Sequence, residues 1–102
     1  MLLAFSVAPA TTDDPDGSVS EAVAEAIRVV RASGLPYRLE SMFTTIEGEW
    51  AECFEVVRQA TEAVQARSPR VSLVIKADIR EGHTGMLTTK VERVERHLAD
   101  DG

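Results

Sequence analysis

The amino-acid sequence predicts an α+β domain whose strands and helices follow in the order β-α-β-β-α-β, with one more helix at the C-terminal end. Apolar residues alternate with a period of two near the start and over residues 71–80, while residues 18–34 and 50–67 have helical spacing. A short link joins the two central extended segments. This order is that of a ferredoxin-like sandwich, in which a four-stranded antiparallel sheet carries two helices on one face.

The composition is that of one soluble globular domain spanning residues 1–102. Of the residues, 44% are apolar and 27% are charged, and the formal net charge is −6. This negative charge argues against a nucleic-acid partner, because phosphate binding requires a basic surface. The only cysteine, Cys53, cannot form an internal disulfide, so we expect a reducing, cytoplasmic location.

The first strand is expected in the apolar run from Leu2 to Ala10. Its bulky residues alternate with small ones, namely Leu3, Phe5 and Val7 with Ala4, Ser6 and Ala8. The run is too short to cross a bilayer and lacks a preceding basic segment. We therefore expect a buried strand rather than a membrane helix or a signal peptide.

The first helix is expected to follow a surface loop at residues 10–17, which contains Pro15 and Gly17. Ser18 and Glu21 have the spacing of a capping box, in which each side chain accepts a hydrogen bond from a backbone N–H. Apolar residues then recur at helical spacing, namely Val19, Val23, Ala26, Ile27 and Val30. Gly34 is the expected C-terminal stop.

The first central extended segment is expected to start at Pro36, with Tyr37 and Leu39 on one face, and the second is a strand from Met42 to Glu47. Because so short a connection cannot make a parallel crossover, they should be antiparallel neighbours. Gly48 ends the second of them. A second helix then runs to about residue 67, and its apolar stripe comprises Trp50, Phe54, Val57, Thr61 and Val64.

The last strand shows the clearest alternation in the chain. Its apolar set is Val71, Leu73, Ile75, Ala77 and Ile79, and the intervening set, which ends at Arg80, is half polar. We expect the apolar face to lie in the core. A loop at residues 81–85 leads to a terminal helix with Val91, Val94 and Leu98 on one side.

The sheet face opposite the two long helices should carry small and mixed residues. These are Ala4, Ser6, Ala8, Ser72, Val74, Lys76 and Asp78. Such a face suits a ligand or a second subunit, and the alternative is a solvated surface. An open face and two edge strands in a small domain favour a homo-oligomer.

Two segments carry a resemblance to a known family. They are SVSEAVAEAIRVVRASGLPYRLESMFTTIEGEWAECFEVVRQATEAV at residues 18–64 and KVERVERHL at residues 90–98. The chain resembles the thiamine-binding protein family, which is related to the YkoF-like hydroxymethylpyrimidine/thiamine binders. The resemblance implies a ferredoxin-like fold, assembly through the sheets into a dimer or tetramer, and binding of thiamine or its pyrimidine moiety without a catalysed reaction.

Glu47 and Thr45 are the first candidate ligand-binding residues under this resemblance. A carboxylate can accept a hydrogen bond from the exocyclic amine of the pyrimidine, and it favours the positively charged thiazolium nearby. Thr45 should share a strand face with Glu47 and could donate or accept a hydrogen bond. The alternatives are a solvated strand end for Glu47 and a simple strand-forming role for Thr45.

Ser20, Ser18 and Trp50 complete the candidate ligand-binding set. Ser18 is either a helix cap or a ligand contact, and Ser20 stands beside the same helix start. That helix start could also hold a phosphate. Trp50 could stack on a ligand ring or pack in the core. These choices place a pocket between the third strand and one of the two long helices.

Catalytic and metal sites are not expected. His83 and His97 lack partners at metal-ligating spacing, and the sequence contains no G-x-S-x-G turn, phosphate loop or dinucleotide fingerprint. No cofactor is expected beyond thiamine as a ligand. The first hypothesis is therefore a non-catalytic, homo-oligomeric binder of thiamine or hydroxymethylpyrimidine. The second is a regulatory or scaffolding module that binds a protein partner through its sheet face.

Overall fold

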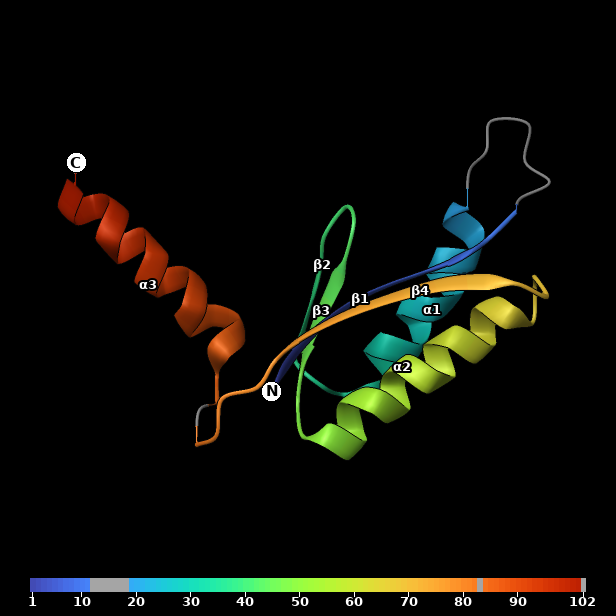
Figure 1. The fold of residues 1–102 in the computed structure, drawn as a ribbon, viewed down its shortest axis with the longest axis horizontal. Helices are drawn as coiled ribbons and strands as arrows, with labels where there is room; N and C mark the ends of the chain where they lie inside the picture. The colour runs from blue at the N-terminus through green and yellow to red at the C-terminus, as the bar shows by residue number, and fades with distance from the viewer. Residues whose placement is uncertain (12–18, 83, 102) are drawn as a thin grey trace.

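A computed structural model describes residues 1–11, 19–82 and 84–101 of the chain (Figure 1). The elements are β1 (Leu2–Pro9), α1 (Ser20–Ser33), β2 (Tyr37–Leu39), β3 (Thr44–Glu47), α2 (Trp50–Gln65), β4 (Val71–Asp78) and α3 (Met86–Asp101). This order confirms the predicted α+β fold and the additional helix after β4.

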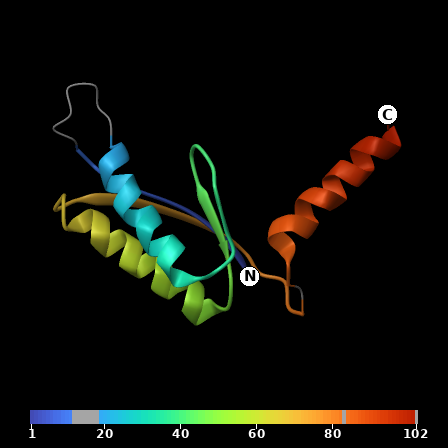
Figure 2. The same cartoon turned by 180° about the vertical axis from the view of Figure 1, so that it is seen from behind.

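The four strands form one antiparallel sheet in the order β2-β3-β1-β4. Helices α1 and α2 lie side by side on one face of the sheet, and α3 projects away from them, from the end at which β4 finishes (Figures 1 and 2). The two edges differ in length, since β2 has three residues and β4 has eight.

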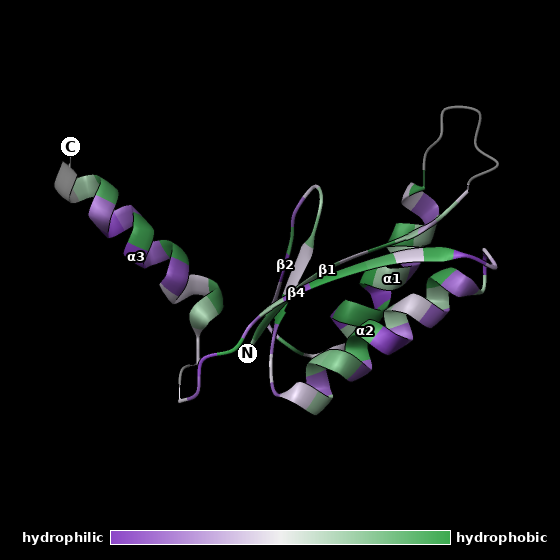
Figure 3. Cartoon of the chain, in the orientation of Figure 1, coloured by the Kyte–Doolittle hydropathy of each residue, from purple (hydrophilic) through white to green (hydrophobic). Residues whose placement is uncertain are grey.

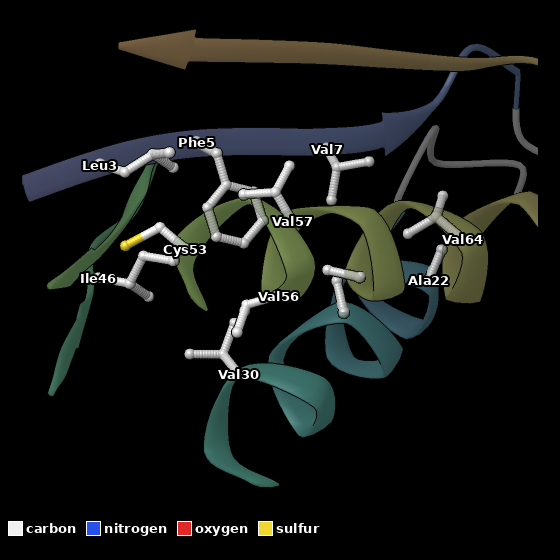
Figure 4. Close-up of a cluster of buried hydrophobic side chains, with 12 residues drawn as sticks. Leu3, Phe5, Val7, Ala22, Val30, Ile46, Cys53, Val56, Val57 and Val64 are labelled. Carbon is white, nitrogen blue, oxygen red and sulfur yellow. The ribbon is translucent and has the colours of Figure 1, made fainter. Parts of the chain in front are cut away.

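The core lies between the sheet and the two long helices (Figure 4). Leu3, Phe5 and Val7 point into it from β1, as their alternation predicts, and Ile46 joins them from β3. The helices contribute Ala22, Ala26, Val30, Cys53, Val56, Val57, Ala60 and Val64. Burial of this apolar surface is the main term that stabilises the fold.

Strand β4 departs from the prediction of a buried apolar face. Leu73 and Ile75 remain 39% and 38% exposed, although Ile75 pairs with the buried Phe5 of β1. The reason is that β4 is an edge strand, and α2 packs mainly on α1 and β1. Figure 3 accordingly shows hydrophobic residues along an edge of the sheet. The strand also ends at Asp78 rather than Arg80.

Helix α2 buries only part of the predicted stripe, since Val57 and Val64 lie in the core and Trp50 and Phe54 do not. Cys53 and Ala60 are fully buried, whereas Phe54 is 37% exposed and Trp50 is 57% exposed. Trp50 begins the helix and stacks on Phe54, with ring centroids 5.2 Å apart and planes 11° apart. Of the two alternatives given for Trp50, core packing is wrong, because the ring remains more than half exposed at the start of α2.

The helix ends are only partly as predicted. Helix α1 begins at Ser20 with Val19 at the N-cap position, and the predicted cap Ser18 lies outside the described residues. Gly34 has φ of 76°, the left-handed conformation expected of a glycine C-cap. At the start of α2 the N–H of Glu49 donates to Oε1 of Glu52 over 3.0 Å, a capping contact that the sequence analysis missed.

Candidate functional site

The face of the sheet opposite α1 and α2 carries two cross-strand rows of functional side chains. We call this surface the open face. One row runs across all four strands and contains Arg38, Thr45, Ala4 and Lys76, and the next contains Glu47, Leu2 and Asp78. These residues share a face because successive side chains of a strand point to opposite sides, and their neighbours point into the core.

Small residues occupy the middle of the open face. Ser6 pairs with Val74 and Ala8 pairs with Ser72, so the central strands carry short side chains beside Ala4. The longer side chains of Arg38 and Lys76 stand at the two edges of the sheet. Because the side chains in the middle of the face are short, a planar ring could lie over them, with charged and hydrogen-bonding groups around it.

Glu47 lies where the open face meets α3. Its Oε2 accepts a hydrogen bond of 2.8 Å from the backbone N–H of Met86, the first residue of that helix. A carboxylate at this place is favourable, because it satisfies a helix N–H and interacts with the positive end of the helix dipole. The other oxygen, Oε1, can accept a further hydrogen bond, for example from a ligand.

Hydrogen bonds of Met1 also stabilise this end of the open face. The Met1 ammonium donates to the Gly48 carbonyl over 2.7 Å, and the Gly48 N–H donates to the Met1 carbonyl over 3.1 Å. The Glu47 N–H donates to the Pro36 carbonyl over 3.0 Å. Backbone hydrogen bonds on both sides of β3 therefore hold Glu47 in position.

Asp78 and Lys90 form an ion pair at the same end. The Lys90 ammonium donates a hydrogen bond to the Asp78 carboxylate and thereby lowers the pKa of that carboxyl group. Asp78 ends β4 and Lys90 lies in the second turn of α3, so the pair is a second connection between the sheet and the helix. The carboxylates of Glu47 and Asp78 and the ammonium groups of Met1 and Lys90 thus gather at one end of the open face.

The structure brings only part of the predicted ligand site together. Thr45 and Glu47 are both half-buried and lie on the open face. Ser20 begins α1, which at 14 residues is about 20 Å long. The far end of α1 leads to Pro36, whose carbonyl accepts from the Glu47 N–H. Ser20 and Glu47 therefore stand at opposite ends of the domain, too far apart for one small ligand.

Trp50 and Ser18 do not join this group either. Trp50 stacks on Phe54, and Phe54 lines a shallow groove with Leu73 and Ile75 on the helix side of the β4 edge. The Trp50 ring thus belongs to an apolar surface away from the open face. Ser18 lies outside the described residues.

A cavity of about 200 Å³ lies between α1 and the turn that joins β2 to β3. Val23 and Ile27 of α1 line one side of the cavity. Leu39, Glu40 and Phe43, beside the turn, line the other. The predicted pocket between the third strand and the first helix corresponds in position to this cavity, but Thr45 and Glu47 do not line it. At this volume it could hold a single ring, since sites for larger ligands span about 300–1,000 Å³.

The described residues contain no cluster of three or more His, Cys, Asp or Glu side chains that could hold a metal ion. Of the two histidines, His97 lies on α3, and His83 is outside the described part of the chain. Cys53 is fully buried, and burial raises the pKa of its thiol, which disfavours the reactive thiolate. In the part of the chain that the structure describes, no helix is long and apolar enough to span a membrane.

Comparison with known proteins identifies relatives along nearly the whole chain. The profile of the thiamine-binding protein family matches residues 3–95. A UPF0045 protein of Mycobacterium tuberculosis is 56% identical over 99 residues, covering 96% of this chain and 94% of the relative. The UPF0045 protein YqgV of Bacillus subtilis is 35% identical over 98 residues, covering 91% of this chain and 92% of the relative.

Two solved structures share the fold. A hypothetical protein of Methanocaldococcus jannascii superposes with a TM-score of 0.83 at 24% identity, covering 92% of this chain and 94% of that one. A Thermotoga maritima protein, described as a candidate thiamine biosynthesis/salvage protein, superposes with a TM-score of 0.73 at 25% identity, covering 88% of this chain and 96% of that one. The family match and the sequence identities show that this chain belongs to the thiamine-binding protein family.

Proposed function

We propose that this protein is a non-catalytic binder of thiamine or its hydroxymethylpyrimidine moiety, and that it acts as a homo-oligomer. The observation that supports this best is the position of Glu47 and Thr45, which share the open face of a chain that matches the thiamine-binding family over residues 3–95. Oε1 of Glu47 can accept from the exocyclic amine of the pyrimidine, and the Thr45 hydroxyl can donate to a ring nitrogen.

The surroundings of Glu47 suit a ligand with one aromatic ring and one cationic ring. The short side chains of Ala4 and Ser6 leave room for a planar ring over the sheet. The carboxylate of Glu47 favours a positively charged thiazolium, whereas that of Asp78 is already paired with Lys90. Arg38 and Lys76, at the edges of the same face, could pair with the phosphate of a phosphorylated form.

Isothermal calorimetry with thiamine, and with hydroxymethylpyrimidine in parallel, tests this proposal. We expect binding in the micromolar range or tighter. The variant Glu47→Gln should weaken it by about 1–3 kcal/mol, or roughly 5- to 150-fold, because the charge-assisted hydrogen bond is lost. The matched control Glu40→Gln removes the same charge beside the cavity between α1 and the β2–β3 turn.

The two variants separate the two candidate sites. Loss of affinity in Glu47→Gln alone supports the open face. Loss in Glu40→Gln alone would move the site to the cavity. Absence of binding heat with both ligands would contradict the binding function itself.

A second candidate function is a regulatory or scaffolding module that binds a protein partner through the open face. The exposure of Val74 on that face favours it, because covering this apolar side chain with a partner is favourable. Copurification of an ultraviolet-absorbing small molecule with the protein would favour the ligand-binding function over this one.

A further inference from the structure

Strand β1 extends beyond its partner β3. It pairs with β4 from Leu2 to Pro9, but with β3 only from Leu2 to Phe5. The β2–β3 hairpin stops there because its two strands are joined by a tight turn, in which the Glu40 N–H donates to the Phe43 carbonyl over 3.0 Å. In the part of the chain that the structure describes, the β3 side of residues 6–9 therefore has no strand partner. We call this side of β1 the free edge.

The register of the sheet shows which backbone groups of β1 face the free edge. The Ala10 N–H donates to the Arg70 carbonyl over 2.9 Å, and this pair continues the register of β1 with β4. In an antiparallel sheet a residue directs its N–H and its C=O toward the same neighbouring strand, and this direction alternates along the chain. Even-numbered residues of β1 therefore bond to β4, and odd-numbered residues face the side of β3. The Met1 carbonyl agrees with this assignment, because it accepts from the Gly48 N–H, which follows β3.

Val7 is consequently left with a donor and an acceptor at the free edge. Neither its N–H nor its C=O has a hydrogen-bond partner among the described residues. Val7 is only 5% exposed, and a buried backbone group without a partner costs about 1–3 kcal/mol. Pro9, the next residue of β1 that faces this side, has no N–H. Val7 therefore offers the free edge both kinds of hydrogen-bonding group in a place where a partner is favourable.

The cavity between α1 and the β2–β3 turn lies beside Val7, which is one of its lining residues. Val23 and Ile27 make one wall apolar, and Phe43 does so on the side of the turn. The volume of about 200 Å³ is sufficient for one six-membered ring, since an apolar cavity of about 150 Å³ can hold benzene. The Glu40 carboxylate, beside the turn, disfavours an anionic ligand.

We infer that this cavity binds a single heterocyclic ring whose edge presents a hydrogen-bond acceptor next to a donor, and that the backbone of Val7 recognises this edge. Aminopyrimidines and lactams belong to this chemical class. The ring acceptor receives the Val7 N–H, and the ring donor bonds to the Val7 C=O, so the ligand replaces the missing neighbouring strand. The apolar walls cover the two faces of the ring.

This site does not use Glu47 or the open face, so it does not rest on the proposed function. Hydroxymethylpyrimidine also carries an acceptor next to an amine donor. The experiments must therefore report which of the two places a ring occupies.

Nuclear magnetic resonance of the full chain with 4-aminopyrimidine, titrated to about millimolar concentration, tests the inference. We expect the Val7 amide proton to move downfield, because its N–H gains a hydrogen bond. The matched probe is 4-(dimethylamino)pyrimidine, which keeps the ring and its acceptor but has no N–H to donate. It should bind at least tenfold more weakly, because the Val7 carbonyl stays unpaired under a ring that excludes water.

A variant that fills the cavity gives an independent test. Val23→Phe places a larger side chain in the wall and should weaken binding of 4-aminopyrimidine at least tenfold. The control is Val29→Phe, at another half-buried valine of α1, which lines the groove between α1 and α2 instead. It should bind the probe as wild type does. Circular dichroism confirms that both variants are folded, and the comparison of the two probes needs only the wild-type protein.

Glu47→Gln separates this site from the open face. We expect it to bind 4-aminopyrimidine with wild-type affinity. A Val7 amide that does not move, as when water alone occupies the cavity, or equal affinities for the two probes would overturn the inference. If the Val7 amide stays in place and Glu47→Gln loses the probe, the ring binds on the open face, which supports the proposed function alone. If the Val7 amide moves but thiamine and hydroxymethylpyrimidine give no binding heat, the cavity site is supported and the proposed function fails.

Discussion

Replacing Glu47 by alanine should loosen α3 while leaving the rest of the domain folded. The Glu47 carboxylate accepts from the Met86 N–H over 2.8 Å in a half-buried position. A hydrogen bond to a charged group contributes about 1.5–3 kcal/mol, and removing a side chain that caps a helix costs about 0.5–2 kcal/mol. Because the carboxylate is partly solvated, we expect about 1–2 kcal/mol, which is roughly a 5- to 30-fold shift toward the unfolded helix.

The effect should be visible because α3 has little else to hold it. It has 16 residues, close to the length at which an isolated helix is marginal in water, and its residues from Lys90 to Ala99 are exposed. Hydrogen–deuterium exchange of the α3 amides, measured in dilute protein to limit self-association, should accelerate by this factor. The amides of β1 and α2 should exchange as in wild type.

Thr45→Ala provides the control for this experiment. Thr45 lies two residues earlier on the same face of the same strand, and its replacement removes no bond to Met86. We expect α3 exchange in this variant to match that of wild type. Exchange in Glu47→Ala within twofold of wild type would refute the idea that Glu47 anchors the helix.

Two further predictions concern stability and ionisation. Phe5 is only 2% exposed, so Phe5→Ala should lower the free energy of unfolding, measured in urea, by about 3–5 kcal/mol. Phe54 is 37% exposed, so Phe54→Ala should lower it clearly less. Equal losses in the two variants would contradict the packing described. Hydrogen bonds from Arg58, and to a smaller extent from Gln59, lower the pKa of the Glu55 carboxyl from 4.5 to about 2. Its ionisation therefore favours the folded state above pH 4.5, and this contribution to stability is lost as the pH falls toward 2. Carboxyl NMR titration should show this midpoint, with Arg58→Ala moving it back toward 4.5; a wild-type midpoint near 4.5 would refute it.

Most of the fold could be predicted because local patterns determine it. The alternation in β1 indicates which residues point into the core, and Gly34 ends α1 in the left-handed conformation that glycine adopts easily. The predictions of buried side chains fail where burial depends on how far a neighbouring helix or strand covers the residue. Helical spacing identifies Trp50 and Phe54 as one side of α2, but only the three-dimensional structure shows that these two side chains remain partly exposed.

The candidate site was predicted to a smaller extent. Alternation along β3 is enough to place Thr45 and Glu47 on one face. The bond from Met86 to Glu47 joins residues 39 positions apart, and no local pattern indicates such a contact. The same limit applies to Ser20, because the sequence does not reveal that α1 separates it from Glu47 by its full length.

The length of the β4 edge has a consequence for how the protein behaves during synthesis and purification. An exposed eight-residue edge offers unpaired backbone groups to any other extended chain. Residues 71–75, VSLVI, carry no charge and no proline, which is the composition of segments that form cross-β aggregates. Lys76 interrupts this run, and without its charge the uncharged stretch would extend to Ala77. A charge next to such a segment is of the kind that limits aggregation of a newly made chain.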